Sequence, residues 1–215
     1  MVFQVYYGPL NAGRVDAFLR LDSLRHRQVY YAEAVARSTG LADRLYKIRD
    51  MYGGYFDPES LLPLKSIRDI REGNYRKHEV VEYYHDSLSA FSSESGNHEV
   101  PANIRDMVSV FYYVRTLNFD TMKYDEIIHI NTFFDDDLFP FDMRYRGRET
   151  ITTRGGTFNC IKLVPFVEPG RIFRKEDDMT LWFSDDPNCV PIRGKFDLIV
   201  GSIKCDLIEW SGLKY

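Results

Sequence analysis

Hydrophobic and polar residues alternate along much of the chain, and this pattern predicts β-strands. Residues 14–22 show the alternation most clearly. One face of this segment carries Val15, Ala17, Leu19 and Leu21. The opposite face is mostly charged, which is typical of an antiparallel strand with one buried side. A turn cluster separates the segment from a strand pattern at residues 1–7, so the two predict a hairpin.

Strand patterns recur through the rest of the chain, separated by turn residues. We expect further strands at about residues 28–38, 64–72, 75–84, 127–134, 139–146, 148–153, 157–165, 179–184, 195–200 and 202–210. No alternation of strands and helices is present. The pattern therefore predicts a mainly β fold, a curved antiparallel sheet of about 11–13 strands that forms a barrel or half-barrel. We expect residues 1–215 to form a single domain.

One segment has a helical period. Its apolar residues recur at the spacing of one helix face, at Ile104, Met107, Val108, Phe111 and Val114. Asn103 can cap the start, and Asp106 places a carboxylate in the first turn. The spacing predicts one main helix at about residues 104–116, packed on the sheet. Residues 39–50 are ambiguous and favour a short helix that leads into a strand near Lys47.

Two further segments are set apart by their side chains. The strand at residues 28–38 carries small residues on one face, at Ala32, Ala34 and Ala36. Another element must approach the backbone closely there, and the main helix is one candidate. Residues 92–97 are rich in Ser and Gly and are expected to form a mobile loop.

Composition excludes several classes of protein. Hydrophobic residues make up 44% of the 215 residues, charged residues 28%, and the formal net charge is -4. This acidic balance argues against a nucleic-acid partner, because such proteins concentrate basic residues on one face. No apolar run approaches the ~20 residues of a membrane helix, so we expect no transmembrane segment. The residues form no motif for a cofactor or a metal ion, and neither is expected.

The three cysteines give no metal-binding spacing. Cys160 and Cys205 lie within strand patterns, where a small buried residue is the favoured role. The pairing of Cys189 stays open. The acidic groups at residues 135–137, 177–178 and 185–186 fit solvated turns better than calcium loops.

Aromatic residues are abundant, with 15 Tyr and 15 Phe. A strand-rich core explains them most simply, and an aromatic-lined cavity is the alternative. In a curled sheet, the inward aromatic residues would be Phe141, Tyr145, Phe158 and Trp182. Arg148 and Glu149 follow Gly147 and could point into such a cavity or form an exposed ion pair. These six residues are the candidate ligand-binding residues, and no catalytic residue is predicted.

Several separated motifs resemble one protein family. They are Tyr6-Tyr7-Gly8-Pro9, Ala12-Gly13, Ser109–Arg115, Gly147-Arg148-Glu149, Gly156–Lys162, Leu181–Asp186 and Gly201–Leu207. In this order they resemble the exported bacterial proteins grouped as domain of unknown function 3108. The resemblance implies a secreted or periplasmic protein of the cell envelope, of the kind found in the Bacteroides group, with a curved antiparallel sheet. The chain starts without a signal peptide, which fits a mature exported protein whose leader has been removed.

Three functions are compatible with these observations. The first is non-enzymatic binding of an apolar or amphipathic ligand, such as a lipid, or of an envelope glycan, because barrel mouths are common ligand sites. The second is a structural role as the partner of another envelope protein, which predicts an exposed apolar patch or an open sheet edge. The third and least favoured is a polysaccharide hydrolase, which requires two facing carboxylates.

Overall fold

A computed structural model describes residues 1–169 and 173–214. Its strands are β1 (Val2–Tyr7), β2 (Leu10–Leu24), β3 (Arg27–Ser38), β4 (Arg49–Phe56), β5 (Pro63–Glu72), β6 (Tyr75–Tyr84), β7 (Ser89–Ser92), β8 (Gly96–Glu99), β9 (Ile127–Ile128), β10 (Asn131–Phe134), β11 (Asp137–Pro140), β12 (Met143–Thr153), β13 (Gly156–Pro165), β14 (Met179–Ser184), β15 (Pro191–Asp197) and β16 (Ser202–Glu209). Its helices are α1 (Gly40–Leu45) and α2 (Ser109–Val114), with a 3-10 turn at His85–Ser87.

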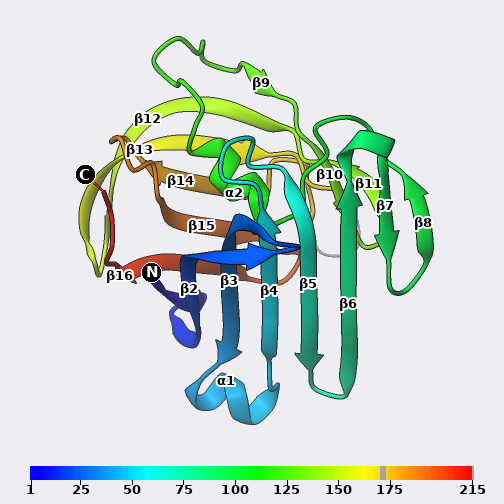
Figure 1. The fold of residues 1–215 in the computed structure, drawn as a ribbon. Helices are drawn as coiled ribbons and strands as arrows, with labels where there is room; N and C mark the ends of the chain where they lie inside the picture. Colours follow the sequence, from blue (N-terminus) through cyan, green and yellow to red (C-terminus); the bar gives the residue numbers. More distant parts are fainter. Residues whose placement is uncertain (170–172, 215) are drawn as a thin grey trace.

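One 14-stranded antiparallel sheet dominates the structure, in the order β8-β7-β6-β5-β4-β3-β2-β1-β16-β15-β14-β13-β12-β9. The sheet does not close, because β8 and β9 form its two edges. Strands β3–β6 run side by side, β12–β16 run across them, and α2 lies between the two halves (Figure 1). The expectation of a mainly β fold with a curved antiparallel sheet is confirmed, in its half-barrel form. Strands β10 and β11 pair separately.

The alternating segment at residues 14–22 lies within β2, which pairs with β3 from Gly13 to Leu24. Val15 and Ala17 pack against buried residues, as expected, whereas Leu19 and Leu21 are 43% and 57% exposed. The hairpin of β2 and β3 extends beyond β4, whose last residue Phe56 pairs with Tyr30. The hydrophobic face of β2 is therefore only partly covered.

The main helix is shorter than the sequence predicted, because α2 starts at Ser109 rather than near Ile104. Arg105, which precedes α2, instead forms a bridge to Thr132 of β10. The N–H of Arg105 donates to the carbonyl of Asn131 at 2.9 Å, and the N–H of Phe133 donates to the carbonyl of Arg105 at 2.9 Å. The backbone N–H and carbonyl of Arg105 are therefore not available for the hydrogen bonds of a helix. The expected short helix before a strand near Lys47 is present as α1.

Turn geometry explains the other differences. Asp135 and Asp136 both have positive φ, 56° and 65°, and form the two-residue turn between β10 and β11. The expected strands at residues 127–134 and 139–146 are therefore divided. Gly147, with φ of 79°, forms a bulge that lets β12 continue past the expected break. The expected loop at residues 92–97 instead turns β7 into β8.

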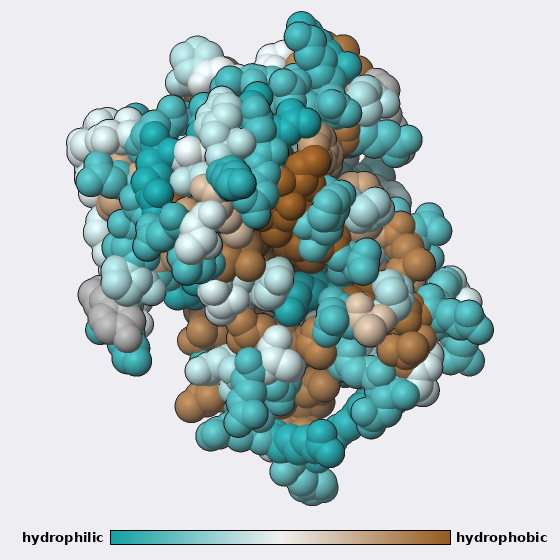
Figure 2. Space-filling model, turned by 90° about the horizontal axis from the view of Figure 1, so that it is seen from above, coloured by the Kyte–Doolittle hydropathy of each residue, from teal (hydrophilic) through white to brown (hydrophobic). Residues whose placement is uncertain are grey.

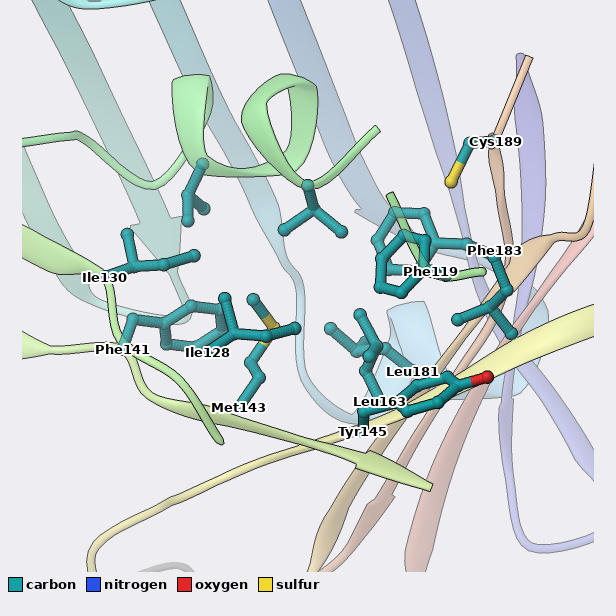
Figure 3. Packing of buried hydrophobic residues seen from close by; sticks show 13 residues of the cluster. Phe119, Ile128, Ile130, Phe141, Met143, Tyr145, Leu163, Leu181, Phe183 and Cys189 are labelled. Carbon is teal, nitrogen blue, oxygen red and sulfur yellow. The ribbon is translucent and has the colours of Figure 1, made fainter. Parts of the chain in front are cut away.

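Buried residues form three clusters. The first joins α2 to β9–β14, and Figure 3 shows its side chains meeting below the helix. The second contains Phe3, Leu207 and Trp182, and the third contains Tyr83, Ile104 and Phe133. Seen from above, exposed hydrophobic residues lie in separate groups among hydrophilic ones (Figure 2). Among the described residues, no helix combines the length and the apolar character needed to cross a bilayer.

Gly54 on β4 sets the distance between the sheet and the segment before α2. A Cβ at this position would lie 3.0 Å from Oδ2 of Asp106 and 3.0 Å from Cβ of Val108. The alanines of β3 predicted that another element approaches the sheet closely. Gly54, on the neighbouring strand, allows this approach.

We expect Gly54→Ala to destabilise the protein by about 1–3 kcal/mol, because the added methyl group overpacks this contact. Gly53→Ala is the matched control, since its Cβ would face the Tyr31 hydroxyl and Met51 sulfur, which are the ends of movable side chains. Urea denaturation of both variants measures the difference. Equal loss of stability in the two would contradict the role of Gly54.

Candidate functional site

The six residues predicted from the sequence form two groups. Phe141 and Tyr145 are buried in the first cluster, and Arg148 lies beside them. The Arg148 guanidinium is 3.4 Å from the Tyr145 hydroxyl and pairs with Asp120 at 2.5 Å and Asp185 at 2.8 Å. Phe141 and Tyr145 meet the other core side chains in Figure 3.

The other three lie on the opposite face of the sheet. Leu181 and Phe183 of β14 belong to the first cluster, whereas Trp182 between them belongs to the second. Glu149 accepts a hydrogen bond from Nε1 of Trp182 at 2.5 Å, and Phe158 packs against the same cluster. Burial opposes ionisation of Glu149, but its bonds to Trp182 and Lys162 outweigh this and lower its pKa. The six residues are thus not brought together, and ligand binding by them stays a prediction.

A different set of polar side chains converges between β4–β6, the segment before α2 and the β10–β11 turn. Arg68 of β5 and Glu79 of β6 are cross-strand neighbours, and Nη2 of Arg68 lies 3.1 Å from Oε2 of Glu79. Their side chains are only 10% and 7% exposed. Charges this deeply buried cost stability unless they are paired, as these two are.

Two further charges complete this ion cluster. Lys77 Nζ lies 3.2 Å from Oε1 of Glu79 and 2.6 Å from Oδ1 of Asp135, which also accepts from Arg68 at 2.5 Å. Asp135 sits in the two-residue turn between β10 and β11, which carries its carboxylate across to β5 and β6. The bonds from Lys77 and Arg68 lower the pKa of Asp135. The Arg68 guanidinium also stacks 4.6 Å from the ring centre of Phe134.

Asp106 approaches the same region from the other side. Its Oδ1 accepts the N–H of Ser109 at 2.7 Å, and the Ser109 hydroxyl accepts the N–H of Asp106 at 3.1 Å. This reciprocal pair satisfies free donors at the start of α2. Asp106 is 2% exposed, and burial raises the pKa of its carboxyl. Burial and the charge of Asp106 also raise the pKa of Tyr83.

Arg68, Glu79 and Asp106 line one cavity of about 30 Å³, partly open to solvent. Among the described residues, Arg68 Nε and Asp106 Oδ2 have no hydrogen-bond partner, although both are buried. Oε1 of Glu79 faces only the Lys77 ammonium. Such atoms are rare in folded proteins and call for a partner. A cavity of this volume accommodates about two water-sized groups. We call these three residues and their cavity the polar cavity.

The chemistry of the polar cavity suits a group that both donates and accepts hydrogen bonds. Asp106 offers an acceptor and Arg68 a donor, while Tyr52 and Phe134 contribute aromatic surface to the lining. In the described part of the chain, no group of three or more His, Cys, Asp or Glu side chains is arranged to hold a metal ion.

Burial raises the pKa of the three cysteine thiols, to about 12 for Cys160, about 11 for Cys189 and about 12 for Cys205. All three thiols are free. The expected burial is confirmed for Cys160, whereas Cys205 is partly exposed.

Sequence reasoning missed the polar cavity, although a signal was present. Arg68 alternates with Ile70 and Ser66 on the buried face of β5, a position where an arginine is unusual. The turn at residues 135–137 was expected and is present, but its role in bridging Arg68 and Lys77 depends on pairing across the fold. Asp106 was correctly expected near the start of a helix.

Comparisons with known proteins bear on the whole chain. The family described as "Protein of unknown function (DUF3108)" matches residues 2–208. The chain belongs to this family. The resemblance noted from the motifs is confirmed. A search of curated proteins finds no relative of this DUF3108 protein by sequence.

One solved structure shares the fold of this DUF3108 protein. A beta-barrel-like protein of the DUF1849 family from Brucella abortus matches with a TM-score of 0.62 at 7% identity, covering 97% of this chain and 94% of that one. A DUF1089 family protein from Pseudomonas aeruginosa gives a TM-score of 0.46 at 8% identity, covering 83% and 87%. At such identities the first match shows a shared fold alone.

We expect Asp106→Asn to stabilise the protein near neutral pH. Because burial raises the pKa of Asp106, the folded state binds this proton more tightly than the unfolded state, and stability falls as pH rises above about 4. The Asn side chain keeps an acceptor for the N–H of Ser109 and carries no charge. Denaturation across pH measures the effect, and the gain should vanish in acid. A loss of stability at every pH would contradict it.

Phe141→Ala and Trp182→Ala are each expected to destabilise the fold by about 3–5 kcal/mol, because both rings are buried in clusters. Neither should change ligand binding at the polar cavity once the variant is folded. Chemical denaturation and a binding assay on the folded fraction separate the two effects. A selective loss of binding would instead assign these rings to a ligand site.

Proposed function

We propose that this protein is a non-enzymatic binding protein of the bacterial cell envelope, and that it takes a hydroxyl-bearing group of an envelope glycan into the polar cavity. One observation carries this proposal: Asp106 Oδ2 and Arg68 Nε are buried and lack partners among the described residues, and both residues line the same cavity. A sugar hydroxyl donates to the first and accepts from the second. The envelope location rests on the resemblance of the motifs.

The size of the cavity favours one hydroxyl or hydroxymethyl group rather than a whole ligand. The sugar ring would then lie at the mouth, beside Tyr52 and Phe134. An apolar or amphipathic ligand is less well supported, because the aromatic residues expected to line its cavity are packed in the first and second clusters. Three carboxylates line the polar cavity, but Arg68 and Lys77 hold those of Glu79 and Asp135, so the arrangement favours binding over hydrolysis.

Asp106→Asn tests the proposal, because the expected changes in stability and binding have opposite signs. Binding should weaken about tenfold or more, since a charge-assisted hydrogen bond contributes about 1.5–3 kcal/mol. The probe is an array of oligosaccharides from bacterial lipopolysaccharide, capsule and peptidoglycan. The control is Asp197→Asn, which removes a half-exposed carboxylate paired with Lys195 at 2.6 Å. Absence of binding by the unmodified protein, or equal binding by Asp106→Asn, would overturn the proposal.

Native mass spectrometry of the protein purified from its own host identifies the ligand class. A bound glycan supports the proposal, and a bound lipid contradicts it.

Partner binding is a second candidate function, favoured by the open edge at β8. Beside it, Val80, Glu82, Tyr84, Phe91 and Ser93 line an open groove of about 400 Å³. The free backbone groups of an edge strand can pair with an extended segment of another protein. A photo-crosslinking residue at Asn97 on β8 tests this in cells, and a lack of crosslinks to any one protein would contradict it.

A further inference from the structure

Helix α1 buries none of its residues, whereas α2 buries three. It connects β3 to β4 and projects from the end of the sheet at the bottom of Figure 1. Leu41 and Leu45 lie one turn apart, so they share a face, and they are 62% and 79% exposed. The outward face of α1 is therefore apolar.

The exposed surface continues from α1 onto the neighbouring turn. Tyr46 lies so close to Gly73 that a Cβ there would be 2.8 Å from its ring. The N–H of Gly73 also donates to the carbonyl of Lys47 at 2.8 Å, which fixes the β5–β6 turn beside the end of α1. Tyr75 follows this turn, and Tyr46 and Tyr75 are 52% and 55% exposed. We call Leu41, Leu45, Tyr46 and Tyr75 the α1 patch.

Cations are interleaved with the α1 patch. Arg44, Lys47 and Arg76 are exposed, and none forms an ion pair within the part of the chain that the structure describes. Of the nearby carboxylates, Asp43 pairs with Arg49 at 2.7 Å and Asp69 pairs with Arg71 at 2.9 Å. Burial and the charge of Asp50 raise the pKa of Glu72, which disfavours its charged form. This local excess of positive charge contrasts with the net charge of -4 for the whole chain.

We propose that the α1 patch docks on the surface of a lipid bilayer that contains anionic phospholipids. Exposed leucine and tyrosine side chains surrounded by Arg and Lys are the composition that binds at the boundary between headgroups and acyl chains. The two leucines enter this boundary, and Arg44, Lys47 and Arg76 contact the phosphates. A second copy of the chain fits less well, because it would place the same three cations opposite each other.

Vesicle binding of the full chain tests the proposal independently of the polar cavity. The probes are vesicles of phosphatidylcholine alone and of phosphatidylcholine mixed with phosphatidylglycerol, and co-sedimentation measures the partition coefficient. We expect binding to the mixed vesicles only. Leu41→Ser/Leu45→Ser should lower the partition coefficient about tenfold or more. Arg44→Gln/Lys47→Gln should lower it about fivefold per charge removed.

Leu19→Ser/Leu21→Ser is the matched control, because it also replaces two exposed leucines, on β2 rather than on α1. It should leave the partition coefficient unchanged. The proposal is overturned if the mixed vesicles do not bind the protein, if both leucine variants bind equally, or if phosphatidylcholine vesicles bind it as well. It is also overturned if sedimentation velocity shows a dimer that Leu41→Ser/Leu45→Ser abolishes, since a second copy would then cover the patch.

Discussion

The pairing of β1 with β16 joins the two halves of this structure. The first strand of the chain lies between β2 and β16, and residues from Val2 to Tyr7 pair with residues from Glu209 to Ile203. Apart from the pairing of β9 with β12, all other neighbouring strands of the large sheet are also consecutive along the chain. Without this pairing, β1–β8 would form one sheet and β12–β16 with β9 another, and α2 would lose one of the two surfaces between which it lies. A contact across the whole chain must therefore form before the interior is enclosed.

The structural features that depend on neighbouring residues in the sequence could be predicted from local patterns. The alternation of residues in β2, β12 and β13 predicted strands, and the motifs identified the family. The start of α2 was wrong because apolar residues at helical spacing also suit an extended segment, and only the pairing of Arg105 with β10 decides between the two. The aromatic candidate ligand residues lie on both faces of the sheet, Phe141 and Tyr145 on one and Phe158 and Trp182 on the other. The bulge at Gly147 and the curl of the sheet determine which cluster each ring joins, and neither is visible in a local pattern.

The polar cavity shows how a buried charge can be retained. Glu79 and Arg68 face each other on adjacent strands, and the β10–β11 turn adds Asp135 from a distant part of the chain. Asp106 opposes them without a partner for one oxygen among the described residues, and its raised pKa marks the cost. Buried polar atoms without partners weaken the fold, and local violations of this kind are typical of functional sites. Gly54 permits this arrangement by leaving room for Asp106.

The burial of the three free thiols has a consequence for their reactivity. A thiol reacts with oxidants and other disulfides through its thiolate, and a pKa of about 11–12 leaves almost none of that form at neutral pH. The fold also depends on no disulfide among the described residues, because each cysteine is free. The folded protein therefore keeps its thiols largely unreactive, whatever the redox potential around it.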